Sequence, residues 1–235
     1  MIRNIFANHG ITITEEQEQK LNQYYDLLID WNNKINLTSI VEYEEVIWKH
    51  FLDSAFFVSC DKVDLKEKKK VLDLGTGAGF PGMVLAILCP DYKFVLADSL
   101  NKRIEFLKVV INRLQIHNVS VIHGRAEELG RDENFRNQFD YVVSRAVAEL
   151  PVLLEYCIPF VKKGGYFVSY KSRRLDEEIE NADNALNMLY TKYDKKYKYE
   201  LEYDHSERYL VFFRCENITD SKYPRKPKKI KTNPL

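Results

Sequence analysis

A glycine-rich run from Val71 to Gly82 contains the residues with the clearest chemical meaning, Val-Leu-Asp-Leu-Gly-Thr-Gly-Ala-Gly-Phe-Pro-Gly. An apolar strand here includes Asp73 and leads into four glycines, Gly75, Gly77, Gly79 and Gly82. Glycine is needed where a turn visits positive φ and where a ligand approaches the backbone closely. Because such turns bind nucleotides at the carboxyl ends of parallel strands, the run predicts a loop that holds an adenosine-containing ligand.

The same loop also fits the dinucleotide pattern GxGxxG from Gly77 to Gly82, so NAD or FAD is an alternative ligand. Asp73 favours S-adenosylmethionine, because a carboxylate there can meet the cationic amino acid end of that cofactor or can order the loop. The chain also shows no second mononucleotide-binding half for a nicotinamide, and its last two predicted strands form a hairpin. We therefore expect S-adenosylmethionine as the cofactor.

Other cofactor contacts are expected where later strands end. Asp98 follows the second predicted strand, where a carboxylate accepts hydrogen bonds from ribose hydroxyls; its alternative role is the N-cap of a helix from Leu100 to Leu114. The Ala126 backbone and the Glu127 side chain follow the third strand and are candidates for the adenine edge. The loop glycines and Phe80 are expected against the methionine part. The predicted cofactor contacts are thus Asp73, Gly75, Gly77, Gly79, Phe80, Asp98, Ala126 and Glu127.

The end of the fourth predicted strand, Ser144-Arg145-Ala146-Val147, bears on the reaction class. It lacks the Asn/Asp-Pro-Pro-aromatic motif of adenine amine methylation, and Cys157 falls inside the next helix, a core position rather than that of a C5-pyrimidine nucleophile. Guanine N7 carries a lone pair and no proton, so a site for it needs positioning but no general base. Arg145 can orient a guanine through O6 or contact the cofactor; a surface ion pair is the structural alternative. No residue is assigned as acid or base, and no metal site is expected.

The N-terminal part of the chain is predicted to be helical over residues 14–58. Thr14 and Gln17 have the spacing of a capping box, and apolar residues then recur at helical spacing. A second helix is expected from Glu42 to Val58. These helices form an N-terminal extension, residues 1–69, ahead of the glycine-rich loop.

From Lys70 onward, short apolar runs alternate with helical patterns, which predicts βαβ units and a three-layer α/β core over residues 70–216. The last two runs form a hairpin-like pair, so the final strand is expected to be antiparallel. The predicted strands are Val71–Leu74, Phe94–Ala97, Val119–Ile122, Tyr141–Val143, Tyr166–Ser169, Tyr197–Tyr203 and Arg208–Cys215, and the predicted helices are Gly82–Leu88, Lys102–Leu114, Leu150–Phe160 and Leu175–Tyr190.

The composition predicts a cytoplasmic protein with no membrane span. The 235 residues are 45% hydrophobic with a formal net charge of zero, and the four cysteines are far apart, which favours buried thiols. The C-terminal tail, residues 217–235, is nevertheless strongly basic. It is either a solvated, frayed end or an arm that contacts phosphate, and composition alone leaves both open.

Several motifs together resemble one bacterial family, the glucose-inhibited division protein B family. They run through nearly the whole chain: Trp31-Asn32-Asn33-Lys34-Ile35-Asn36-Leu37-Thr38, His50-Phe51-Leu52-Asp53-Ser54, Gly75 to Gly82, Asp98-Ser99 with Lys102-Arg103, Gly124-Arg125-Ala126-Glu127, Ser144-Arg145-Ala146, Lys171, and Tyr223-Pro224-Arg225-Lys226-Pro227. The resemblance implies a class I, Rossmann-like methyltransferase with a seven-stranded, mainly parallel sheet. It implies methylation of guanine N7 in small-subunit (16S) ribosomal RNA. It also implies cofactor contacts at Gly75, Phe80, Ala126, Glu127 and Arg145.

An RNA substrate needs a basic surface, and five residues are candidates for it if they meet in space: Lys102, Arg103, Arg125, Lys171 and Arg225. The motif around Asn32 and Thr38 can either turn the chain between two helices or touch RNA, and His50 is expected to be a core histidine rather than a catalyst. The partner is small-subunit ribosomal RNA, and the protein is expected to be a monomer. Two alternatives remain open: a methyltransferase of the same fold that acts on a small molecule or protein, and a non-catalytic cofactor-binding module.

Overall fold

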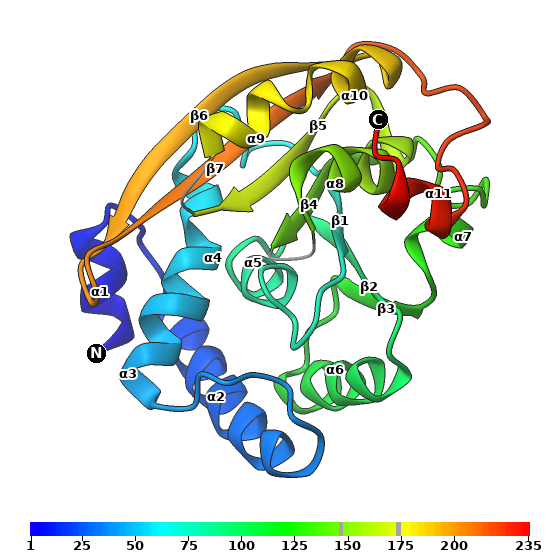
Figure 1. Ribbon diagram of the computed structural model, residues 1–235. Helices are drawn as coiled ribbons and strands as arrows, with labels where there is room; N and C mark the ends of the chain where they lie inside the picture. Colours follow the sequence, from blue (N-terminus) through cyan, green and yellow to red (C-terminus); the bar gives the residue numbers. More distant parts are fainter. Residues whose placement is uncertain (146–147, 173–174) are drawn as a thin grey trace.

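The computed structural model describes residues 1–145, 148–172 and 175–235, and these contain one seven-stranded sheet (Figure 1). Its strands are β1 (Lys70–Leu74), β2 (Lys93–Asp98), β3 (Val119–His123), β4 (Phe139–Arg145), β5 (Val161–Lys171), β6 (Thr191–Leu201) and β7 (Ser206–Cys215). They are ordered β3-β2-β1-β4-β5-β7-β6, and β7 alone runs antiparallel to its neighbours. The predicted mainly parallel sheet with one antiparallel strand is confirmed.

The strand order changes direction between β1 and β4, so the carboxyl ends of these two strands border a crevice in which α/β proteins bind ligands. Alternate side chains of β1 point into two different cores. Val71 belongs to one core and Leu72 to the other, because successive side chains of a strand face opposite sides of the sheet. Helices cover both faces, which gives the three predicted layers (Figure 1).

One core joins the sheet to the N-terminal helices and to α5 and α6, and the second joins it to α8, α10 and α11. The N-terminal extension and the C-terminal tail therefore share cores with the sheet. The helical elements are α1 (Ile2–Asn8), α2 (Glu15–Ile35), α3 (Tyr43–Val46), η1 (Ile47–Leu52), α4 (Asp53–Ala55), η2 (Phe56–Ser59), α5 (Gly82–Leu88), α6 (Asn101–Leu114), α7 (Ala126–Leu129), α8 (Leu150–Cys157), η3 (Ile158–Phe160), α9 (Leu175–Glu180), α10 (Asp183–Met188) and α11 (Pro227–Thr232).

The predicted capping box begins α2 and also attaches that helix to the core. The Gln17 backbone N–H donates to Thr14 Oγ1 at 3.1 Å, and the Thr14 N–H donates to Gln17 Oε1 at 2.9 Å. The Gln17 amide then donates to the Ile87 carbonyl of α5 at 3.0 Å. One glutamine thus satisfies a helix end and holds α2 against α5 beside the glycine-rich loop.

The helix predicted from Glu42 to Val58 is a continuous helical segment from Tyr43 to Ser59, but it is not regular. Its middle, η1, is a π-helix that carries Lys49 and His50. Wide turns of this kind occur often at functional sites. The sixth strand also differs from expectation. β6 already begins at Thr191, because its pairing with β7 continues across a bulge after Tyr193.

The C-terminal tail is packed rather than frayed, which decides against a solvated end. Tyr223 is 3% exposed and Ile230 is fully buried, and α11 packs against α8 (Figure 1). Within the described residues, no helix is both long and apolar enough to span a membrane.

Candidate functional site

The glycine-rich loop after β1 is held from below by Asp73. This carboxylate is fully buried, and its Oδ2 accepts hydrogen bonds from Thr76 Oγ1 at 2.6 Å and from the Gly82 N–H at 2.7 Å. Burial raises the pKa of Asp73 to about 6, although both hydrogen bonds oppose the rise. Asp73 was predicted either to meet the amino acid end of the cofactor or to order the loop, and these contacts order the loop. A side chain at Gly82 would collide with Asp73, so this glycine allows the close contact.

The loop glycines serve different purposes. Gly75 and Gly77 have φ of 73° and 60°, and a Cβ on Gly77 would meet nothing within 4 Å, so open space lies over this part of the loop. A Cβ on Gly79 would instead collide with the hydroxyl of Tyr24 and come within 2.9 Å of Leu107. Gly79 therefore has a packing role as well: it admits the N-terminal helix α2, whose Tyr24 hydroxyl donates to the Ala78 carbonyl, and its predicted cofactor contact stays a prediction.

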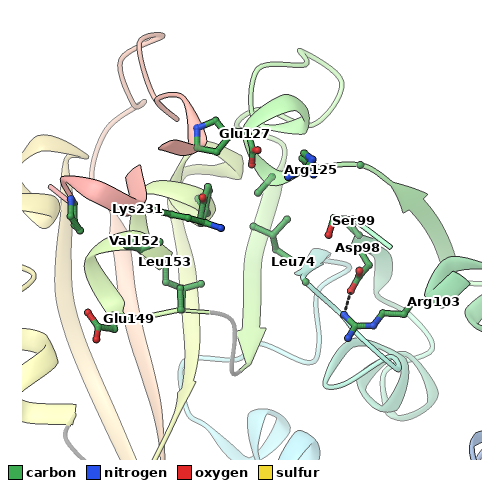
Figure 2. Close-up of a pocket in the computed structure, with 18 residues that line it drawn as sticks. Leu74, Asp98, Ser99, Arg103, Arg125, Glu127, Glu149, Val152, Leu153 and Lys231 are labelled. Atoms are coloured by element: carbon green, nitrogen blue, oxygen red, sulfur yellow. Dashed lines mark hydrogen bonds and ion pairs between the residues drawn. The ribbon is translucent and has the colours of Figure 1, made fainter. Parts of the chain in front are cut away.

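A cavity of about 580 Å³ opens beside the loop, and we call it the loop cavity (Figure 2). It collects side chains from the ends of β1 and β2, from α7 and α8, and from the C-terminal segment. Four of the predicted cofactor contacts line it: Gly75, Asp98, Ala126 and Glu127. Its size is within the range of cofactor sites, about 300–1,000 Å³.

Asp98 lines the loop cavity as an almost fully buried carboxylate. Its Oδ2 accepts from Arg103 Nη1 at 3.2 Å (Figure 2) and from the Gly77 N–H at 2.9 Å, while Oδ1 accepts from the Leu100 N–H at 2.9 Å. Leu100, not Asp98, is the N-cap of α6, so the N-cap alternative is wrong. Asp98 instead joins the glycine loop to the start of α6 and still lines the cavity.

A second cavity, of about 450 Å³, lies between η1 and the ends of β4 and β5. We call it the arginine cavity, since Arg145 and Arg208 line it together with Lys49, His50, Asp53 and Lys171. Phe80, predicted at the cofactor, does not line the loop cavity. It stacks on His50 at 4.3 Å between ring centroids, and the Arg145 guanidinium lies 5.3 Å from its ring centre.

Arg145 is held on three sides in the arginine cavity. Its Nη1 donates to Asp53 Oδ2 at 2.7 Å and to the Lys49 carbonyl at 3.0 Å, and Nη2 donates to His50 Nδ1 at 3.1 Å. The Arg145 side chain is 15% exposed and that of Asp53 only 6%, so the predicted surface ion pair is in fact largely buried. Asp53 Oδ1 also accepts from Tyr199 at 2.8 Å. The neighbouring residues Ala146 and Val147 lie outside the described part of the chain.

His50 Nδ1 lies 3.1 Å from Arg145 Nη2 and 3.2 Å from the Lys49 carbonyl. Because Arg145 can only donate, we assign the proton to Nε2, which lies 3.0 Å from Thr38 Oγ1 and then donates to it. Burial lowers the pKa of His50 to about 3, with the Arg145 charge adding to the effect. His50 is therefore a neutral structural imidazole, as its position on an apolar helix face predicts. Asn32 is likewise structural, because its Oδ1 accepts from the Leu37 and Thr38 N–H groups.

The low pKa of His50 predicts a pH dependence of stability. Between the folded value near 3 and the ordinary value of 6.5, the unfolded chain binds more protons, so stability falls as the pH is lowered through this range. His50→Gln keeps an acceptor for Arg145 and a donor for Thr38 but cannot titrate. In urea titrations from pH 7 to 4.5, we expect the wild type to lose up to about 1.4 kcal/mol per pH unit more than the variant. Parallel pH profiles for the two proteins would contradict this assignment.

The five residues predicted to contact RNA do not form one surface. Arg103 and Arg125 line the loop cavity, while Lys171 lines the arginine cavity, where it donates to Glu178 at 2.6 Å and to the Ala148 carbonyl at 3.1 Å. Lys102 is exposed on α6. For Arg225 the prediction is corrected, because its guanidinium is bound to the buried Glu155 and is not available to phosphate.

Comparison with known proteins identifies the family. The family model "GidB: rRNA small subunit methyltransferase G" matches residues 17–204. The chain belongs to this family. The protein named ribosomal RNA small subunit methyltransferase G from Lachnoclostridium phytofermentans is 50% identical over 92% of this chain and 88% of its own, and that from Alkaliphilus metalliredigens is 48% identical over 93% and 90%. The fold also matches Aeropyrum pernix fibrillarin, a structure with natively bound S-adenosyl-L-methionine, at a TM-score of 0.53 and 16% identity over 69% of this chain and 73% of that one.

Membership in the GidB family confirms the predicted resemblance, the class I methyltransferase fold and the methyltransferase activity with S-adenosylmethionine as methyl donor. The loop cavity fits that cofactor on structural grounds, through its volume and through Gly75 and the Asp98 carboxylate in its lining. All four cysteines are buried, as predicted, and burial raises the pKa of Cys157 well above its usual value.

Sequence reasoning assigned no site role to three charged residues of the arginine cavity, Lys49, Asp53 and Arg208. All three line the arginine cavity and surround Arg145 with charge. Asp53 falls inside a motif that carried the family resemblance, His50 to Ser54, and that was the available signal. Nothing in its spacing, however, indicates a partner 92 residues away.

Proposed function

We propose that this protein transfers the methyl group of S-adenosylmethionine to N7 of one guanosine in 16S ribosomal RNA of the small ribosomal subunit. The observation that carries the proposal is the arginine cavity. It offers Arg145 to position a base, and its described lining residues leave no group poised to remove a proton.

Each described side chain of the arginine cavity that could act as a general base already binds other protein groups. His50 has its pKa lowered to about 3 and accepts a hydrogen bond from Arg145. Asp53 holds Arg145 and Tyr199, and Glu178 holds Lys171 and the Leu150 N–H. Methylation of an amine or hydroxyl needs a proton acceptor, whereas guanine N7 has no proton to lose. The cavity therefore favours N7 over the exocyclic amines and the ribose hydroxyls, which must lose a proton.

Cofactor binding is assigned to the loop cavity. Gly75 and Gly77 give the ligand access to the backbone, Asp98 accepts from the ribose hydroxyls, and Ala126 with Glu127 borders the adenine. S-adenosylmethionine, when bound, supplies an electrophilic methyl group on its sulfonium. The protein residues bind it, exclude water and hold the two cavities in a fixed relation, which is the main contribution available when no proton moves.

Target binding is assigned to the arginine cavity. Asp53 and His50 fix the Arg145 guanidinium, which keeps N–H donors for the O6 atom of a guanine. A base that enters the cavity must leave its stack, as single-stranded RNA segments allow. Arg208 at the same cavity, with Lys102 and Arg125 near the loop cavity, would contact phosphates and make affinity fall with salt. We expect a cytoplasmic monomer.

Methyl transfer tests the proposal directly. Labelled S-adenosylmethionine is incubated with the protein and with small-subunit RNA, or whole subunits, from cells that lack it, and the label is mapped. We expect label on a single guanosine, released by chain cleavage specific for N7-methylguanine. Label on another base would overturn the N7 assignment. Label on a free metabolite or protein, or tight cofactor binding without turnover, would instead support one of the alternatives, a different substrate or a binding module.

A further inference from the structure

The C-terminal segment, residues 223–235, is held against α8 by a buried ion pair. Glu155 of α8 is fully buried, and its Oε1 accepts from the Arg225 backbone N–H at 2.8 Å and from Arg225 Nε at 2.8 Å, while Oε2 accepts from Arg225 Nη2 at 2.6 Å. Bidentate hydrogen bonds between a guanidinium and a carboxylate are among the strongest hydrogen bonds in proteins. This pair, rather than a contact with RNA, accounts for the arginine in the tail.

Two more arginines hold the same segment by its carbonyl groups. Arg136 Nη1 donates to the Tyr223 carbonyl at 2.7 Å, and Arg131 Nη2 donates to the Pro224 carbonyl at 2.8 Å. Ile230 is fully buried in the core that includes α8. The position of α11 is therefore fixed by charge-assisted hydrogen bonds just before its start and by the burial of Ile230.

Held in this position, the C-terminal segment forms one wall of the loop cavity, to which it contributes Pro227, Lys231 and Pro234. Figure 2 shows Lys231 across the cavity from Asp98, beside Val152 and Leu153 of α8. Lys231 has no ion-pair partner among the described residues, so its ammonium group is not committed elsewhere. A lysine in this position can donate hydrogen bonds to purine nitrogens and ribose oxygens.

We propose that the C-terminal segment is a part of the cofactor site, in which Lys231 contacts the adenosine half of the ligand and the seated segment retains it. The inference rests on the cofactor assignment of the proposed function and adds residues that lie outside the glycine-rich loop. Because the segment covers the cavity without belonging to the sheet, cofactor affinity depends on the Arg225–Glu155 pair as well as on the loop. Release of bound cofactor becomes faster when the segment is displaced.

The test measures binding without RNA, by calorimetric titration with S-adenosylmethionine and with its demethylated product, S-adenosylhomocysteine. A truncated chain that ends at Lys226 removes α11 but keeps Arg225, and Lys231→Ala removes one side chain. Lys228→Ala is the matched control, because it is an exposed lysine of the same helix that does not line the cavity. We expect the truncation to raise Kd about tenfold or more for both ligands, a change of about 1.4 kcal/mol or more, Lys231→Ala to raise it severalfold, and the control to leave it unchanged.

Melting curves of the free variants separate binding from folding. A folded truncated chain with unchanged Kd overturns the proposal, and an effect of truncation without any effect of Lys231→Ala overturns the Lys231 contact. If the truncated chain does not fold, the Lys231→Ala titration decides alone, since that side chain is exposed and its loss leaves the fold intact. A protein that binds cofactor through this wall but methylates no RNA would refute the proposed function and leave this inference standing.

Discussion

Replacing Arg145 with alanine should lower kcat by about a hundredfold or more, because a misplaced target base alone costs that much. The affinity for S-adenosylmethionine should stay the same, since Arg145 lines the arginine cavity and not the loop cavity. Single-turnover methylation of small-subunit RNA and cofactor titration on the same sample measure the two quantities. A weakened cofactor affinity with normal turnover of bound complex would return Arg145 to the cofactor contacts.

The substitution also has a structural cost that must be controlled. It leaves the buried Asp53 carboxylate without its main partner, which in buried pairs destabilises a fold by about 3–5 kcal/mol. The double variant Arg145→Met with Asp53→Asn removes both charges and should recover much of that loss in urea unfolding. Turnover should remain low in the double variant, because the guanidinium is still absent. Recovery of turnover together with stability would show that Arg145 acts only through the fold.

Gly79→Ala should destabilise the protein far more than Gly77→Ala, although both glycines belong to the same motif. At Gly79, φ is 99° and the new methyl group collides with the Tyr24 hydroxyl and approaches Leu107. At Gly77, φ is 60° but the space is open. We expect a loss of about 3 kcal/mol or more for Gly79→Ala, from strain and overpacking together, and about 1 kcal/mol for Gly77→Ala, as measured by urea unfolding.

A second-site change separates collision from backbone strain. Tyr24→Phe removes the hydroxyl that the new methyl group would meet, so the double variant with Gly79→Ala should be more stable than the sum of the two single effects predicts. Cofactor titration should show the opposite order of the two variants. Gly77→Ala should weaken cofactor binding more than Gly79→Ala, although its effect on stability is small. Strict additivity of Tyr24→Phe and Gly79→Ala would refute the role given to this contact.

The sequence identifies most of the framework, because local patterns report local geometry. Glycines spaced after an apolar strand predicted the loop, Thr14 with Gln17 predicted the start of α2, and the alternation of strands and helices predicted the sheet, all of which the structure contains. Boundaries were less certain where an element is irregular. The π-helix η1 and the bulge in β6 leave no mark in hydrophobic periodicity.

The assignment of residues to sites needed the tertiary structure. The motif residues fall into two cavities, and Gly79 and Phe80 face packed side chains. Arg145 binds Asp53 and His50, which lie 92 and 95 residues away along the chain. Arg225 of the tail binds Glu155, which lies 70 residues away. The sequence by itself determined the family, the cofactor loop and the order of elements, because these depend on residue type and spacing. Only the fold decided which charges meet, because distant contacts depend on how whole layers pack.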